Sequence, residues 1–173
     1  MCSSDLGWAG DGHVLAINSP TIVTNLLLGD STLAYADLTP ISNLYTEYLA
    51  FVVRPESALR TPQDLLTRLA RDTAGVEIAF ATAIGNINHM ALAKVVRHAG
   101  GDVRALNTTV FDSARYAIAH VLECKAEVSA ITATSAVPEI NAGKLRTLVV
   151  SSPSPLGGPF AGVPTWRDSG VDC

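Results

Sequence analysis

Short apolar runs alternate with apolar residues at helical spacing through most of the chain. Val76–Ala81 is a continuous apolar run with β-branched and aromatic members, which is typical of a buried strand. Small and polar residues follow at Thr82–Asn88. From Asn88 on, apolar residues recur with the period of one helix face, at Ala91, Leu92, Val95, Val96 and Ala99. This stretch therefore predicts a strand, a tight polar turn and a helix over Asn88–Ala99.

The same alternation recurs on both sides of this unit. It predicts further strands at His13–Asn18, Ile41–Tyr45, Tyr48–Val53, Val103–Val110, Ala126–Ile131 and Leu145–Val150. It predicts further helices from Ser19 to Leu28, at Pro62–Arg71 and Ser113–Cys124, before Gly143, and at Pro164–Ser169. Strands that alternate with helices favour an α/β architecture with mostly parallel sheets.

Local signals support two of these helices. Thr61-Pro62-Gln63-Asp64 combines a capping residue, a proline at the first helical position and an acid in the first turn. In the helix after Ser113, the apolar spacing predicts that Ile118 and Val121 are buried, while Glu123 lies on the far side.

Four predicted strand-to-helix turns are rich in small polar residues: Ser19–Thr21, Thr82–Asn88, Phe111–Ser113 and Thr132–Ser135. Ligands of open α/β sheets bind at the carboxyl ends of the strands, where such turns meet. The first N–H groups of a helix lack intrahelical partners and attract anions. Because no turn carries a lysine or arginine, the pattern indicates recognition by N–H groups, hydroxyls and water. The alternative, that each turn only caps its helix, is favoured for any single turn taken alone.

Composition narrows the classes of partner. A chain of 173 residues is long enough to bury the core of one ordinary domain or of two small lobes. Its composition, 48% hydrophobic and 16% charged, is that of a folded protein. A net charge of −4 and a pI near 5.5, without a basic run, argue against nucleic acid. No apolar stretch reaches the ~18 residues of a membrane span.

The patterns typical of metal, nucleotide and hydrolytic sites are absent. His120 and Cys124 have the spacing of metal ligands, but no further ligands accompany them, so we expect no metal. The three cysteines also form no disulfide framework. No glycine-rich nucleotide motif follows a strand, so we expect no cofactor. Ser113, Asp112 and His89 could be drawn as a triad, but nothing in the sequence positions them together. We expect His89 on the flank of its helix, near Val96, with a local hydrogen bond.

Six segments carry a family likeness, and their order and spacing agree over residues 10–171. They are Asp11–Leu15 with Asn18-Ser19 (DGYTLL…NS in the family), Asp37–Ile41 (DFTPI), Phe51–Pro55 (LVVxP), Thr82–His89 (SGxGSxxH), Asn141–Arg146 (xAGKLRxLAV) and Val163–Gly170 (VPTxxExG). With these segments the chain resembles the substrate-binding receptors of tripartite tricarboxylate transporters, the Bug-type periplasmic solute-binding proteins.

The resemblance implies an α/β fold like that of type II periplasmic binding proteins, in which two lobes clasp a small carboxylate as a Venus flytrap does. It implies a monomeric periplasmic receptor, not an enzyme, that serves the membrane subunits of a tripartite tricarboxylate transporter. Ligand contacts are then expected from the polar turns, at Ser19, Thr21, Thr82, Ala83, Gly85, Asn86, His89, Asp112, Ser113 and Thr132.

The chain also departs from the family pattern. The family's signal peptide, first strand with its glycine-rich loop, and C-terminal helices have no counterpart, so we expect a receptor truncated at both ends. Ala83 and Asn86 replace the usual glycine and serine, and Phe111–Ser113 replaces a Tyr-Lys-Gly segment. The predicted organisation is a non-native or unstructured leader (1–9), part of a first lobe (10–54), a second lobe (55–145) and a truncated return to the first lobe (146–173).

Two alternatives stay open. One is a small α/β enzyme that acts on a carboxylate or phosphate at the same helix N-terminus. It would need an acid–base pair or a metal cluster at workable spacing, which the sequence does not display. The other is that the chain is a piece of a receptor without activity of its own.

Overall fold

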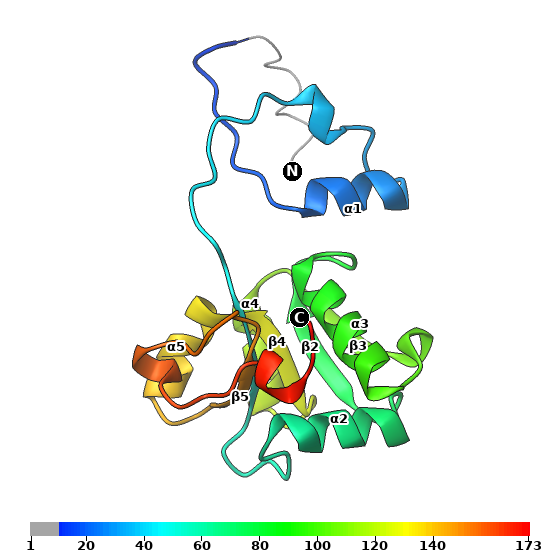
Figure 1. Cartoon of the computed structure of the whole chain (residues 1–173), viewed down its shortest axis with the longest axis vertical. Coiled ribbons are helices and arrows are strands. Elements are labelled where there is room, and N and C mark those ends of the chain that lie inside the picture. The colour runs from blue at the N-terminus through cyan, green and yellow to red at the C-terminus, as the bar shows by residue number, and fades with distance from the viewer. Residues whose placement is uncertain (1–10) are drawn as a thin grey trace.

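The computed structural model describes residues 11–173, so the leader predicted over 1–9 lies outside the described residues. Figure 1 shows a sheet covered by helices, preceded by a segment that contains α1. The helices are α1 (Thr21–Leu28), α2 (Pro62–Arg71), α3 (Ile87–Ala99), α4 (Ala114–Leu122) and α5 (Ala133–Asn141). The strands are β1 (Leu49–Val53), β2 (Glu77–Ala81), β3 (Asn107–Phe111), β4 (Val128–Thr132) and β5 (Arg146–Val150).

The five strands form one sheet in the order β3-β2-β4-β1-β5. β2 is parallel to β3 and β4, whereas β1 is antiparallel to both β4 and β5. Four strands therefore point the same way, and β1 runs against them, so the pairing is mixed rather than mostly parallel. The sequence could not show this, because a strand buried on both faces has the same apolar run in either direction.

The position of β1 and β5 corrects the predicted lobe boundaries. The sequence predicts that residues 10–54 and 146–173 both belong to a first lobe. Hydrogen bonding instead places Leu49–Val53 and Arg146–Val150 in the sheet that holds the strands of the predicted second lobe. The sheet-containing body therefore begins at β1, and β5 completes its edge.

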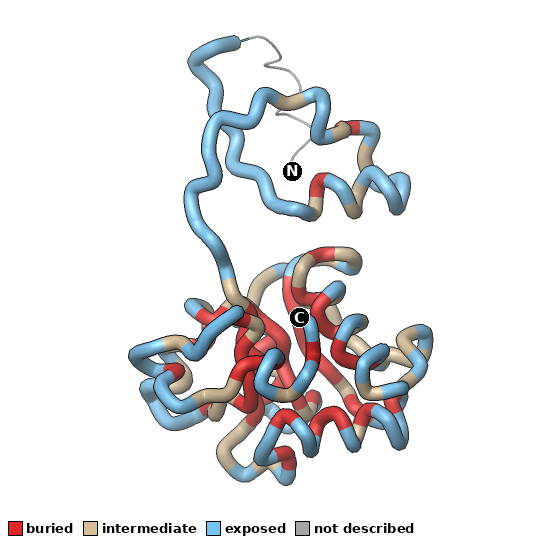
Figure 2. Tube along the Cα trace, in the orientation of Figure 1, coloured by how far each residue is buried: buried red, intermediate tan, exposed pale blue. Residues whose placement is uncertain are grey.

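Helices cover both faces of the sheet (Figure 1), and the residues of β1 alternate between two cores. Phe51 and Val53 pack with residues of α2 and α3, while Ala50 and Val52 pack with residues of α4 and α5. The ring of Phe51 meets Trp166 edge-on, with centroids 5.1 Å apart, and both residues are fully buried. Figure 2 shows this buried interior as a red band through the body.

The segment before β1 is almost entirely exposed (Figure 2). Within residues 11–48, only Ile22 and Leu33 are buried. The strands predicted at His13–Asn18 and Ile41–Tyr45 are wrong, because both stretches are irregular in the structure. A strand is stabilised by a paired neighbour, and neither stretch has one among the described residues.

Most helix signals are confirmed. Thr61 Oγ1 accepts from the Asp64 N–H, and the Asp64 carboxylate accepts from the Thr61 N–H, which is the capping box that the sequence indicated. Ile118 and Val121 are buried as predicted. The strand predicted from Val103 is shorter, since residues 103–105 form a 3-10 turn before β3. Within residues 11–173, no helix combines the length and apolar character needed to cross a membrane.

Candidate ligand-binding site

Three of the four predicted polar turns lie along one edge of the sheet. β3, β2 and β4 are neighbours and point the same way, so their carboxyl ends meet there. The register pairs Ala81 with Phe111, which puts Thr82 and Asp112 on neighbouring strand ends. β4 passes into α5 directly at Thr132. This edge, which we call the carboxyl edge, matches the place where open α/β sheets bind ligands.

Two asparagines hold the turn between β2 and α3. The Oδ1 atom of Asn86 accepts from the His89 N–H at 3.0 Å and so caps α3. The side-chain amides of Asn86 and Asn88 both donate to the carbonyl oxygen of Ala81, and both residues are buried. The Asn86 amide, predicted as a ligand contact, is therefore used within the turn, where it shapes the backbone.

Gly85 and His89 are joined in the same turn. Gly85 has φ +84°, which a residue with a side chain rarely adopts, and its N–H donates to His89 Nδ1 at 3.1 Å. Because Nδ1 is an acceptor, the ring proton of neutral His89 is on Nε2. The imidazole also stacks on Phe80, with ring centroids 5.5 Å apart. The predicted local hydrogen bond of His89 is confirmed.

Burial lowers the pKa of His89. The folded chain then binds this proton less readily than the unfolded chain, so neutral His89 stabilises the fold above its unfolded pKa, and the contribution is lost as the pH falls. We expect the free energy of unfolding to decrease between about pH 7.5 and about pH 5.5, and to decrease less in His89→Gln. Urea titrations at both pH values measure this. His98→Gln, an exposed position on the same helix, is the control, and an equal effect there would contradict the assignment.

Backbone donors remain free at the start of α3 and α4. Among the described residues, the N–H groups of Ile87 and Asn88 have no acceptor, and neither do those of Ala114 and Arg115. Such groups, with the helix dipole behind them, favour an anion. Arg115 also adds a positive charge to the carboxyl edge. Arg115 lies outside the four polar turns of the sequence, although it stands only two residues after Ser113.

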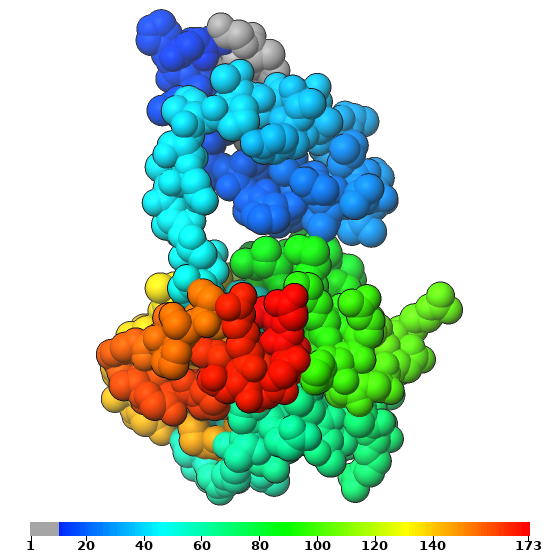
Figure 3. All heavy atoms as spheres, viewed as in Figure 1, coloured from blue at the N-terminus to red at the C-terminus, as the bar shows by residue number. Residues whose placement is uncertain are grey.

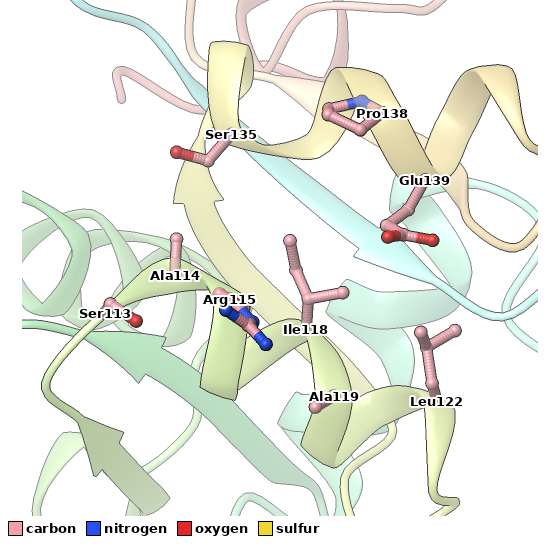
Figure 4. A pocket seen from close by; sticks show the side chains of 9 residues that line it. All are labelled: Ser113, Ala114, Arg115, Ile118, Ala119, Leu122, Ser135, Pro138 and Glu139. Atoms are coloured by element: carbon pink, nitrogen blue, oxygen red, sulfur yellow. The ribbon is translucent and has the colours of Figure 1, made fainter.

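A cavity of about 580 Å³ opens between α4 and α5 (Figure 4). Ser113 and Ser135 lie at one end, and Glu139 and Leu122 lie at the other. Ser135 Oγ is 2.8 Å from Thr132 Oγ1, so the cavity joins parts of two predicted turns. The complete lining is Ser113, Ala114, Arg115, Ile118, Ala119, Leu122, Ser135, Pro138 and Glu139.

Three further predicted ligand contacts, Thr82, Ala83 and Asp112, belong to the turns at the carboxyl edge. Thr82 is exposed, with Oγ1 3.3 Å from the Asn86 amide, and Asp112 is exposed beside Ser113. Ala83 supplies the carbonyl oxygen that accepts from the Asn86 N–H. These residues lie at the carboxyl edge, and their contact with a ligand stays a prediction.

The turn before α1 is different. Ser19 Oγ donates to Thr21 Oγ1 at 3.0 Å, so the hydroxyls of this turn bond to each other. It is the other end of α1 that approaches the carboxyl edge: a Cβ placed on Gly85 would lie 3.0 Å from Leu28 Cδ1 and 3.4 Å from Thr24 Cβ.

This α/β body, with polar turns at the carboxyl edge of a mixed sheet, has the fold of solved periplasmic solute-binding proteins. The chain superposes on a TctC solute-binding protein from Polaromonas with a TM-score of 0.76 and 24% identity, over 99% of this chain and 59% of that one. A model of the tripartite tricarboxylate transporter family receptor matches residues 7–173, and the chain belongs to this family. The fold class predicted from the sequence is thereby confirmed.

Two further structures share the fold. MatC from Rhodopseudomonas palustris, solved with bound malate, gives a TM-score of 0.66 at 19% identity, over 78% of this chain and 44% of that one. An R. palustris protein solved with adipate gives 0.62 at 16% identity, over 72% and 40%. The chain thus spans 59% or less of the length of these three structures. A comparison with curated proteins found no match.

Proposed function

We propose that the chain is the ligand-binding part of a periplasmic receptor that captures a small carboxylate and delivers it to the membrane subunits of a tripartite tricarboxylate transporter. The observation that carries this proposal is the free N–H pair of Ile87 and Asn88 at the start of α3. These donors stand at the carboxyl edge, in the turn that resembles the family's motif. A carboxylate suits them because it accepts hydrogen bonds and complements the helix dipole.

Malate and adipate, which the two R. palustris proteins hold, support the choice of ligand class, because each is a small molecule with two carboxylates. The start of α4 adds a second set of donors on the same edge, together with the cation of Arg115. We propose that one carboxylate meets the start of α3, while Ser113 and Arg115 favour negative charge nearby. Ser19 and Thr21, at the start of α1, stay proposed ligand contacts.

The geometry favours a receptor over a small α/β enzyme. A Ser–His mechanism needs the imidazole within hydrogen-bond reach of the serine. His89 Nδ1 instead accepts from Gly85, and Ser113 begins a helix on the opposite face of the sheet. The proposed receptor is monomeric and works in the periplasm.

Isothermal titration calorimetry of the full chain tests the proposal. Malate, adipate and citrate are the ligands, and succinamide is the uncharged control. We expect at least one of the acids to bind and the diamide not to bind. Binding of the diamide with equal affinity, no binding of any acid, or turnover of an acid would contradict the proposal.

A negative charge introduced into the turn before α3 tests whether the acid binds there. Thr82→Asp places a negative charge at the exposed edge of the turn, close to the start of α3. We expect it to weaken the affinity for the acid several-fold, because like charges repel. Thr67→Asp, at an exposed position of α2, is the matched control and should leave the affinity unchanged.

A further inference from the structure

The cavity between α4 and α5 opens on the face of the sheet that lies opposite α3. Residues of α4 and α5 pack together on this face, whereas residues of α3 pack on the other. No described residue before β1 lines the cavity. In Figure 3 the segment before β1, coloured blue to cyan, stands above the body and leaves yellow to orange atoms of the body uncovered. The cavity is therefore a feature of the body alone.

Most of the cavity wall is apolar. It consists of Ala114, Ile118, Ala119 and Leu122 on α4 and Pro138 on α5. Ile118 is buried and joins the core of this face, while Ala119 and Leu122 are half-buried and keep apolar surface in the cavity. From Arg115 to Leu122, α4 rises ~10 Å, which is the extended length of an octyl chain. A pocket with an apolar wall and few polar groups is typical of a site for a small organic molecule.

The two ends of the cavity differ in charge. Arg115, in the first turn of α4, is exposed, and none of the ion pairs within residues 11–173 includes it. Glu139 lies at the other end, beside Leu122 (Figure 4). Its Oε2 atom is buried, and the Lys144 ammonium 3.2 Å away supplies the countercharge. One end therefore offers an unpaired cation, whereas a carboxylate placed at the other end would face Glu139.

We propose that this groove binds an aliphatic monocarboxylate, with its carboxylate beside Arg115 and its chain against Ile118, Ala119 and Leu122. Burial of the chain supplies most of the affinity, because each methylene removed from water is favourable, whereas an exposed ion pair contributes little. Arg115 sets the direction in which the molecule lies. The groove is independent of the proposed function, since an apolar chain binds there whether or not a diacid binds at the start of α3.

Amide NMR spectra of the full chain, titrated with octanoate, test the groove. We expect saturable shifts concentrated in α4 and α5, with the signals of Ile87 and Asn88 at the start of α3 unchanged. Ala119→Trp fills the groove and should weaken octanoate binding at least tenfold. Ala93→Trp is the matched control, at a half-buried alanine of α3 on the other face of the sheet, and should bind octanoate as wild type does.

Arg115→Gln tests the charge without adding bulk. We expect it to weaken octanoate binding several-fold and to leave the binding of octan-1-ol unchanged, because the alcohol carries no charge for Arg115 to attract. Suberate, the diacid of the same chain length, should bind in the groove less tightly than octanoate, because its second carboxylate meets Glu139.

The outcomes separate the groove from the proposed function. Absence of saturable octanoate shifts in α4 and α5 would overturn the groove, and so would shifts confined to the turn before α3 or to residues 11–48. If Ala119→Trp does not fold, equal octanoate affinity of wild type and Arg115→Gln overturns it as well. A chain that binds none of malate, adipate or citrate in calorimetry would contradict the receptor and leave the groove standing.

Discussion

Phe51→Ala is expected to lower the free energy of unfolding by about 3–5 kcal/mol, as other truncations of buried aromatic residues do. Phe51 is fully buried in β1, between β4 and β5, and its ring packs edge-on against Trp166. Removing the ring leaves a cavity that hydrogen-bonded strands on both sides cannot collapse to fill. Urea unfolding followed by tryptophan fluorescence measures the loss.

Two variants control this result. Phe51→Leu keeps most of the apolar volume and should cost clearly less than Phe51→Ala. Tyr116→Ala removes an aromatic ring from an exposed position and should be close to neutral. Equal losses for Phe51→Ala and Tyr116→Ala would show that Phe51 is not buried in the core of the sheet.

Gly85→Val is expected to weaken carboxylate binding about tenfold or more, a loss of about 1.4 kcal/mol. A branched residue cannot adopt φ +84° without strain, and its Cβ would press on Leu28. The turn would shift, and with it the N–H groups of Ile87 and Asn88. No single side-chain donor should matter as much, because one charge–dipole contact at a helix end contributes about 0.3–2 kcal/mol. Calorimetry with the acid that binds wild type gives the comparison.

Gly143→Val is the control that introduces the same kind of backbone strain away from the proposed site. Gly143 also has positive φ, +71°, but no atom lies within 4 Å of its Cβ position, and it follows α5. It should lose stability from the same backbone strain and keep its affinity. An equal loss of affinity in both valine variants would contradict a site at the turn before α3.

His89→Ala tests the same turn from its other side. It removes the acceptor of the Gly85 N–H, so the turn loosens, while Asn86 still caps α3. We expect a loss of affinity much smaller than that of Gly85→Val. If His89→Ala abolished binding or exposed a lost turnover, the enzyme hypothesis would replace the receptor.

The sequence by itself determined the local elements that carry their own signals. The capping box at Thr61 and the apolar faces of α3 and α4 are encoded by residues within a few positions of one another. The strand-turn-helix unit at the turn before α3 was predictable for the same reason. Hydroxyl-rich turns after parallel strands also indicated the edge at which the candidate site lies.

Tertiary structure alone decided which strands pair, and in which direction. β1 could be recognised as buried, but its antiparallel place between β4 and β5 depends on partners that lie about 80 and 100 residues further along the chain. The stretches His13–Asn18 and Ile41–Tyr45 have apolar patterns like those of strands, yet remain irregular because no strand pairs with them among the described residues. Likewise, the approach of Leu28 to Gly85 and of Ser113 to Ser135 joins residues from separate elements. Local sequence determines what each segment tends to form, but only packing supplies the neighbours that make a strand pair or a site complete.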